Sequence, residues 1–184
     1  MKKRVILVGH GASGKDHARK ILQKVLRMPY QVSYTTRPPR EGEEDGKDYF
    51  FISEEQFNKM AASDQWYEYV TFNGWHYGTT KEQFYTDGSV FIMTPTGLSH
   101  LTPKDRADSL VFFFNIDEEI RRERMSQRVG NADSVERRLE ADRKDFHNFT
   151  DWDEQIKNPG FELADVAHSI RKNVVIPIET FFNA

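Results

Sequence analysis

A glycine-rich loop near the start of the chain limits how this sequence can fold more than any other feature. Residues 9–16 read Gly-His-Gly-Ala-Ser-Gly-Lys-Asp, which matches the phosphate-loop pattern G-x-x-x-x-G-K. The apolar run 5–8 precedes the loop. Apolar residues follow it at helical spacings of three and four: Ala18, Ile21, Leu22, Val25 and Leu26. Because strand, glycine loop and helix form the context in which this pattern binds phosphate, we predict that the chain begins with this unit.

The chemistry of the loop indicates that it binds a nucleoside triphosphate. Its glycines allow backbone N–H groups to turn inward around phosphate oxygens, and the helix N-terminus adds partial positive charge. Lys15 supplies a mobile ammonium group that can follow the β- and γ-phosphates. The residues expected to contact ATP phosphates are Gly9, Gly11, Ala12, Ser13, Gly14, Lys15, Asp16 and His17. The sequence therefore predicts an enzyme that transfers phosphoryl groups.

The residue after the lysine departs from the usual pattern. Asp16 stands where Ser or Thr normally supplies a hydroxyl ligand for Mg²⁺. A carboxylate is also a hard oxygen donor that can hold this ion directly or through water. In the alternative interpretation, Asp16 only complements the helix dipole, an effect of about 0.3–1 kcal/mol. We predict that Asp16 helps to bind the Mg²⁺ that accompanies ATP.

Composition narrows the class of protein. A length of 184 residues suffices for one compact domain with inserted lobes. The formal net charge of -3 argues against a protein that coats nucleic acid, while a local basic cluster can still bind nucleotides. The absence of cysteine excludes disulfides, thiolate zinc sites and cysteine nucleophiles. Since no apolar run is long enough to span a membrane, we expect a cytoplasmic protein with no nucleic-acid or membrane partner.

Apolar runs along the rest of the chain complete the predicted fold. The continuous runs at 90–93 and 110–114 fit parallel strands that are covered on both faces, and residues 151–158 suggest another strand. A last helix is indicated by an apolar face made of Leu163, Val166, Ala167 and Ile170. Strands that alternate with helices after a phosphate loop predict an α/β, three-layer P-loop fold with a parallel central sheet.

Two segments interrupt this alternation. Residues 33–80 are polar and aromatic with repeated turn signals, so we expect an inserted lobe of short strands and one helix over 53–62, which begins with a capping box. Residues 117–147 are highly charged and predict a pair of helices. We therefore divide the single domain 1–184 into a core, a lobe and a charged helical segment. The core comprises 1–32, 81–116 and 148–184, the lobe 33–80, and the helical segment 117–147, which the family resemblance described below implies to be a lid.

Two features together resemble the guanylate kinase family. One is the phosphate loop, and the other is the string S-x-T-T-R-x-x-R-x-G-E at 33–43, followed by Gly-Lys-Asp-Tyr-Phe-Phe at 46–51. The likeness covers nearly the whole chain and continues through 68, 74–79, 124–128 and 135–139. The resemblance implies a P-loop nucleoside monophosphate kinase. Such an enzyme transfers the γ-phosphoryl group of ATP to GMP or dGMP and gives ADP with GDP or dGDP.

The resemblance also implies roles for residues of the lobe. Arg37, Arg40, Tyr49 and Tyr77 would hold the GMP phosphate, and Ser33, Glu68 and Thr79 would recognise guanine. The chemistry supports these roles, because arginine forks match phosphate oxygens and a carboxylate can accept from the adjacent N1–H and N2–H₂ of guanine. Adenine has an acceptor at N1 and would leave polar groups of such a site unpaired.

In the lid, the resemblance singles out Arg124, Arg128 and Arg138 as arginines that face the phosphates and act in catalysis with Lys15. Positioned guanidinium groups stabilise the charge that spreads over a transferring phosphoryl group. Acidic residues are interspersed among the other cations of this stretch, so we expect those cations to lie on solvated helix surfaces. They are Arg121, Arg122, Arg137, Arg143 and Lys144.

The chain departs from the family pattern at one further place. Guanylate kinases usually carry Asp-x-Asp after the strand that corresponds to 90–93, where this chain has Thr94-Pro95-Thr96. We interpret this difference and Asp16 together as a shift of the Mg²⁺-organising charge into the loop. Ribose 1,5-bisphosphate kinases share the Gly-Lys-Asp loop ending but lack the full guanine set. Two alternatives remain open. One is a kinase of the same fold with another acceptor, such as a ribose bisphosphate, and the other is a guanylate kinase-like binding module that has lost catalysis.

Overall fold

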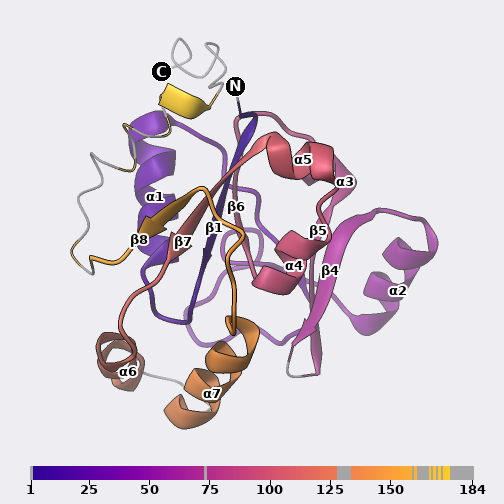
Figure 1. Ribbon diagram of the computed structural model, residues 1–184. Helices are drawn as coiled ribbons and strands as arrows, with labels where there is room; N and C mark the ends of the chain where they lie inside the picture. Colours follow the sequence, from indigo (N-terminus) through magenta and orange to yellow (C-terminus); the bar gives the residue numbers. More distant parts are fainter. Residues whose placement is uncertain are drawn as a thin grey trace. The chain divides into compact units, whose positions relative to one another are not determined.

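The structure is a computed structural model that describes residues 2–72, 74–127 and 134–158, together with 160, 166, 168, 170 and 172–174 (Figure 1). The chain forms two compact units. The first, which we call the core unit, comprises 1–30 and 87–184, and the second, the lobe unit, comprises 31–86. In the described residues, no helix is long and apolar enough to cross a membrane.

A four-stranded parallel sheet forms the centre of the core unit. Its strands follow the order β6 (Val90–Met93), β1 (Arg4–Gly9), β7 (Ser109–Phe114) and β8 (Glu154–Ile156). Every residue of β1 and β7 is buried, as expected for parallel strands that are covered on both faces. The predicted α/β fold with a parallel central sheet is therefore confirmed, and β8 lies within the predicted strand segment 151–158.

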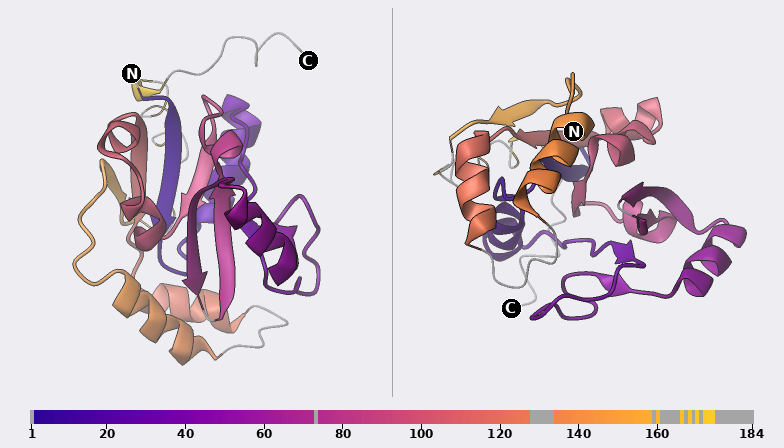
Figure 2. Two further views of the ribbon diagram at one scale, coloured as in Figure 1. Left: turned by 90° about the vertical axis from the view of Figure 1, so that its right-hand side faces the viewer. Right: turned by 90° about the horizontal axis from the view of Figure 1, so that it is seen from below.

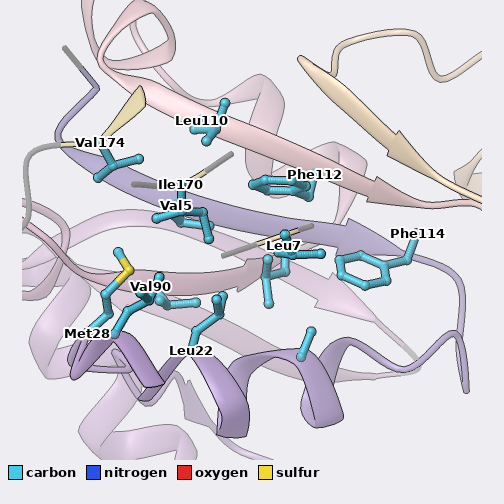
Figure 3. Close-up of a cluster of buried hydrophobic side chains, with 13 residues drawn as sticks. Val5, Leu7, Leu22, Met28, Val90, Leu110, Phe112, Phe114, Ile170 and Val174 are labelled. Carbon is cyan, nitrogen blue, oxygen red and sulfur yellow. The ribbon is translucent and has the colours of Figure 1, made fainter. Parts of the chain in front are cut away.

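Helix α1 (Lys15–Leu26) covers one face of this sheet. Its buried residues Ala18, Leu22 and Leu26 join the main hydrophobic core with side chains of β1, β6 and β7 (Figure 3). Val166 and Ile170 are helical and lie in the same core, whereas Leu163 and Ala167 of the predicted last helix lie outside the described residues. The apolar spacing that predicted α1 thus produces its core-facing side.

The remaining helices of the core unit are α4 (Pro95–Ser99), α5 (Pro103–Ala107), α6 (Glu118–Ser126) and α7 (Val135–Asp145). Figure 2 shows α6 and α7 side by side near the end of β1 that leads into the glycine loop. They form the two helices predicted for the charged stretch. Residues 128–133, which join them, lie outside the described residues, and Arg128 is among them.

The lobe unit contains a second four-stranded sheet, with the order β3 (Phe50–Phe51), β2 (Tyr34–Thr35), β5 (Trp75–Thr80) and β4 (Trp66–Phe72). Strands β4 and β5 pair antiparallel, β2 pairs antiparallel with β5, and β3 pairs parallel with β2. The short helix α3 (Lys81–Phe84) follows β5 and contacts both β4 and β5. Most of the strand residues therefore come from one long hairpin.

Helix α2 (Glu54–Ala62) packs on this hairpin. It begins with the predicted capping box, in which the Ser53 hydroxyl accepts from the Gln56 N–H and the Gln56 side chain accepts from the Ser53 N–H. The Phe57 ring stacks on Trp66 at 5.0 Å and on His76 at 4.3 Å between ring centroids. These aromatic contacts hold the two strands that carry most of the predicted guanine-binding residues.

Candidate active site

The glycine loop leaves β1 where that strand lies very close to β7. A Cβ atom at Gly9 would meet Phe114 Cβ at 2.8 Å and Ser13 Oγ at 2.9 Å, so this position accepts only glycine without a shift of the backbone. Gly14 precedes α1 with φ 99°, in the left-handed region that favours glycine. It offers no side-chain cap, so α1 begins at the loop with the uncapped, partially positive end that attracts anions.

Ala12 also has a positive φ, of 58°, which for a residue with a side chain costs roughly 1–2 kcal/mol. Its methyl group packs in a small buried cluster with Met125 of α6 and Leu139 of α7. This apolar packing offsets part of the backbone strain. The conformation of the loop is therefore supported by α6 and α7.

The Lys15 ammonium group lies over the loop itself. Nζ donates hydrogen bonds to the carbonyl oxygens of Gly9, at 2.6 Å, and His10, at 2.8 Å. The Ser13 side chain is buried beside it, with Oγ at 3.5 Å from Nζ. These contacts keep the positive charge at the loop, where the sequence predicts the β- and γ-phosphates.

His10 is a packing residue of the loop. Its ring lies 4.1 Å from the Phe146 ring and 5.6 Å from the Phe113 ring, measured between centroids. Burial, together with the charges of Arg121 and Lys15, lowers the pKa of His10 to about 4. The imidazole is therefore neutral at pH 7 and adds a contact between the loop and the segment that follows α7.

Asp16 points outward from the first turn of α1. Its side chain is 71 % exposed, and Oδ1 lies 3.3 Å from Arg19 Nε. No group of three or more metal-type ligands occurs within the described residues. Mg²⁺ is commonly held by one or two carboxylates, waters and substrate phosphates, so an accessible carboxylate next to Lys15 fits a site of that kind. The metal role of Asp16 stays a prediction.

Thr94, the first of the two threonines that stand in place of Asp-x-Asp, has a structural use. The Thr94 hydroxyl accepts a hydrogen bond from the Gly97 N–H at 3.0 Å and caps the N-terminus of α4, and Pro95 occupies the first turn. Threonine at this place therefore begins a helix directly after β6. A hydroxyl that caps a helix does not supply the charge that a carboxylate would bring.

Of the predicted lid arginines, Arg124 reaches the loop. Its Nη1 donates to the Ala12 carbonyl oxygen at 3.2 Å. Arg138 lies in the first turns of α7, and Arg128 lies outside the described residues. The prediction that Arg121 lies on a solvated surface was wrong. Arg121 is only 4 % exposed, because its guanidinium pairs with Asp142 of α7 at 2.8 Å and its Nε donates to the Ile116 carbonyl at 2.9 Å.

The predicted guanine-recognition residues of β4 and β5 face one another. Glu68 pairs with Thr79 across the two strands, and the Thr79 side chain hydrogen-bonds the Glu68 carboxyl group. Burial raises the pKa of Glu68 to about 7, and the bond from Thr79 opposes that rise. Tyr77 lies two residues before Thr79 and therefore on the same face of β5, while Ser33 directly precedes β2.

Three of the four residues predicted to bind the acceptor phosphate form one cluster. The guanidinium carbon of Arg37 lies 5.4 Å from the centre of the Tyr49 ring, and the Tyr49 and Tyr77 rings lie 5.8 Å apart. Arg37 is buried against the rings of Tyr49 and Phe51, whereas Arg40 is exposed three residues further on. The lobe unit thus gathers a cation and two phenols, and one of these phenols, Tyr77, lies on β5 with Thr79.

Glu43 is a residue of this site that the sequence analysis left without a role. Its carboxylate accepts from Nη2 of Arg37 at 2.8 and 2.9 Å and from the backbone N–H of Arg40 at 2.7 Å. Glu43 therefore holds both predicted phosphate-binding arginines. The sequence feature that could have indicated this role is the position of Glu43 as the last residue of the family string that begins at Ser33.

Comparisons with known proteins agree with this architecture. The family model described as guanylate kinase matches residues 1–173. The guanylate kinase of Novosphingobium aromaticivorans is 33% identical over 156 residues, which cover 80% of this chain and 70% of that protein. The guanylate kinase of Helicobacter pylori is 31% identical over an alignment of 185 residues, which covers 96% of this chain and 90% of that protein. The crystal structure of guanylate kinase from Anaplasma phagocytophilum, with 22% identity, superposes with a TM-score of 0.67 over 94% of this chain and 85% of that one, which shows a shared fold.

Proposed function

The chain belongs to the guanylate kinase family, and we propose that it transfers the γ-phosphoryl group of ATP to GMP or dGMP. The observation that carries this proposal is the buried Glu68 carboxyl group opposite Thr79. A desolvated carboxylate needs hydrogen-bond donors, and guanine brings N1–H and N2–H₂ side by side. The lobe is therefore suited to a guanine base and would leave polar groups unpaired with adenine.

Arg37, Arg40, Tyr49 and Tyr77 are proposed to hold the acceptor phosphate. Arg37 has five N–H donors. Nη2 donates to both carboxylate oxygens of Glu43, and Nη1 donates to the Pro38 carbonyl oxygen at 2.7 Å. Within the described contacts, Nε–H and the second Nη1 N–H have no protein partner, and these two donors suit phosphate oxygens. Ser33 and Thr79 are proposed to add hydroxyl contacts to guanine.

The phosphate loop, with residues 9 and 11–17, is proposed to hold the triphosphate of ATP. Lys15 would follow the β- and γ-phosphates, and Arg124, Arg128 and Arg138 would stabilise the charge of the transferring group. Mg²⁺, which we place at Asp16 with the ATP oxygens, neutralises phosphate charge when it is bound. No covalent nucleophile of the protein is required, because an oxygen of the GMP phosphate attacks directly and catalysis consists of positioning and charge stabilisation.

Two further parts of the proposal concern the organisation of the chain. We assign the GMP-binding role to the lobe 33–80 and the lid role to 117–147, around a core made of the other residues. Closure of both over the nucleotides would exclude water from the transfer. Solution scattering with and without both nucleotides tests this, since closure predicts smaller dimensions in the presence of both.

The activity is tested by an ATP-dependent turnover assay with GMP, dGMP, AMP, CMP, UMP and ribose 1,5-bisphosphate as acceptors. We expect ADP and GDP or dGDP as products, with the other acceptors strongly disfavoured. Turnover of ribose 1,5-bisphosphate in preference to GMP would support a kinase with another acceptor. Binding of GMP without turnover of any acceptor would support a non-catalytic module, which the threonines at 94 and 96 favour.

A further inference from the structure

A largely buried ion pair, with the Arg121 side chain 4 % exposed and the Asp142 side chain 17 % exposed, ties the phosphate loop to helices α6 and α7. Neither residue belongs to the proposed catalytic set. Oδ2 of Asp142 accepts from the Gly11 N–H at 2.9 Å and from Nη1 of Arg121 at 2.8 Å. Nε of Arg121 donates to the Ile116 carbonyl oxygen, just before α6. One carboxylate therefore joins the loop, α6 and α7.

The side chains of Met125 on α6 and Asp142 on α7 approach the backbone of Gly11 closely. A Cβ atom at this residue would lie 2.7 Å from Met125 Cε and 3.4 Å from Asp142 Oδ2. The Met125 and Leu139 side chains pack against Ala12, the next residue of the loop. The loop thus contacts both helices through its backbone and through a methyl group.

The electrostatics argue that this pair is not present for stability alone. Burial raises the pKa of Asp142 against the effects of the Gly11 N–H and of the Arg121 and Lys15 charges, and burial lowers the pKa of Arg121. Replacement of a buried ion pair by an apolar pair is often neutral or stabilising. The hydrogen bonds of the pair do, however, favour the arrangement of α6 and α7 in which Arg121 and Asp142 meet at the Gly11 N–H.

Helical geometry connects the pair to the proposed catalytic arginines. Arg121 precedes Arg124 by three residues on α6, and Asp142 follows Arg138 by four residues on α7. Residues at these spacings lie on the same face of a helix. A bond between Arg121 and Asp142 therefore sets the rotation of both helices about their axes, and with it the directions in which Arg124 and Arg138 project.

We propose that Asp142 is a positioning residue of the donor site. Its carboxylate fixes the Gly11 peptide and, through Arg121, aligns the helices that carry Arg124 and Arg138. This inference rests on the proposed function, which assigns those arginines to the transferring phosphoryl group. Because such arginines act on charge that develops in the transition state, misalignment lowers kcat more than it weakens the binding of either nucleotide.

The test compares variants of the full chain by kcat, by KM for GMP, by the Kd of ATP and by the thermal midpoint. Asp142→Asn keeps an acceptor for the Gly11 N–H but removes the charge that Arg121 needs. We expect kcat to fall about tenfold, which is less than the 10²–10³-fold typical for loss of a direct transition-state donor. KM for GMP and the Kd of ATP should stay within about twofold of the wild-type values. Glu140→Gln, an exposed carboxylate of the same helix that pairs with Lys144, is the matched control and should leave kcat unchanged.

A second variant separates positioning from folding. Arg121→Met combined with Asp142→Leu replaces the ion pair by an apolar pair and should keep the thermal midpoint while kcat stays low. Wild-type kcat in this double variant, or in Asp142→Asn, would overturn the proposal. A wild-type protein that phosphorylates a different acceptor would overturn the proposed function instead, and the same comparison with that acceptor would still test Asp142.

Discussion

The two regions proposed to bind anions in this chain are supported in different ways. In the lobe, Arg37 is held by Glu43, six residues further along the chain, which also accepts from the backbone of Arg40 three residues before it. In the core, the Gly11 N–H is held by Asp142, which is 131 residues away in the sequence. The lobe therefore carries its support within one motif, whereas the phosphate loop depends on the folded position of a distant helix.

This difference predicts how each region responds to change. A local support can be lost while the rest of the lobe stays folded, because the β4–β5 hairpin and α2 are held by separate aromatic contacts. The support of the phosphate loop cannot be separated from helices α6 and α7 in the same way. Substitutions in the lobe should act on GMP alone, and substitutions at the loop should act on the transfer step.

The largest effect is expected for Arg37→Ala. The variant removes two proposed hydrogen bonds to the GMP phosphate, each worth roughly 1.5–3 kcal/mol when a charged group takes part. We expect kcat/KM for GMP to fall by about 100-fold or more, with the Kd of ATP unchanged. Lys47→Ala, which removes an exposed cation of the same segment that pairs with Glu44, is the control. An equal loss of ATP affinity in Arg37→Ala would contradict the independence of the two regions.

A somewhat smaller effect is expected from pH. Burial raises the pKa of Glu68 to about 7, so the carboxylate form, which is proposed to accept from guanine, predominates above pH 7 and is lost as the pH falls through this value. We expect KM for GMP to rise about tenfold between pH 8 and pH 6, one decade for each unit below the pKa. Since the GMP phosphate also titrates near pH 6, Glu68→Gln serves as the reference. The same pH dependence in wild type and Glu68→Gln would show that Glu68 is not the titrating group.

Much of the fold follows from local sequence patterns. The apolar runs at β1, β6 and β7 and the helical spacing in α1 each correspond to a buried element, and the capping box at Ser53 marks the observed start of α2. These features depend on residues within one element, so they are visible before folding. The order β6-β1-β7-β8 depends on long-range pairing and was predicted only as a parallel sheet.

The candidate site also divides into residues that local sequence patterns predict and residues that depend on long-range contacts. The family string at 33–43 placed Arg37, and the following segment 46–51 placed Tyr49. Their proximity in the lobe follows from short-range connections through β2 and β3. Nothing in the sequence marked Arg121 as buried, because interspersed acids such as Glu118 and Asp142 gave the pattern of a solvated helix. Burial became possible only when Asp142, from another helix, supplied the compensating charge.

A modest effect is expected when the local support of the lobe is removed. Glu43→Gln keeps an acceptor but loses the charge that attracts Arg37, so we expect KM for GMP to rise roughly fivefold, or about 1 kcal/mol, with little change in kcat. Glu44→Gln is the control, because Glu44 is exposed and pairs with Lys47 instead. If Glu43→Gln lowers kcat as strongly as Asp142→Asn does, the two regions do not differ in the way proposed.

The smallest effect is expected at Asp16, where the loop meets solvent. Asp16 pairs only loosely with Arg19 and is mostly exposed, so its loss should disturb the fold little. If its carboxylate organises the Mg²⁺ of Mg·ATP, Asp16→Asn should lower kcat a few-fold and raise the Mg²⁺ concentration at half-maximal ATP binding. Asp16→Ser should not restore full activity, because Thr94 caps α4 and no strand-end carboxylate accompanies the new hydroxyl. Arg19→Gln, which removes the ion pair but keeps the carboxylate, should leave the Mg²⁺ midpoint unchanged. A wild-type Mg²⁺ midpoint in Asp16→Asn would show that Asp16 only complements the helix dipole. The support of the donor site would then come from α7 and the loop alone.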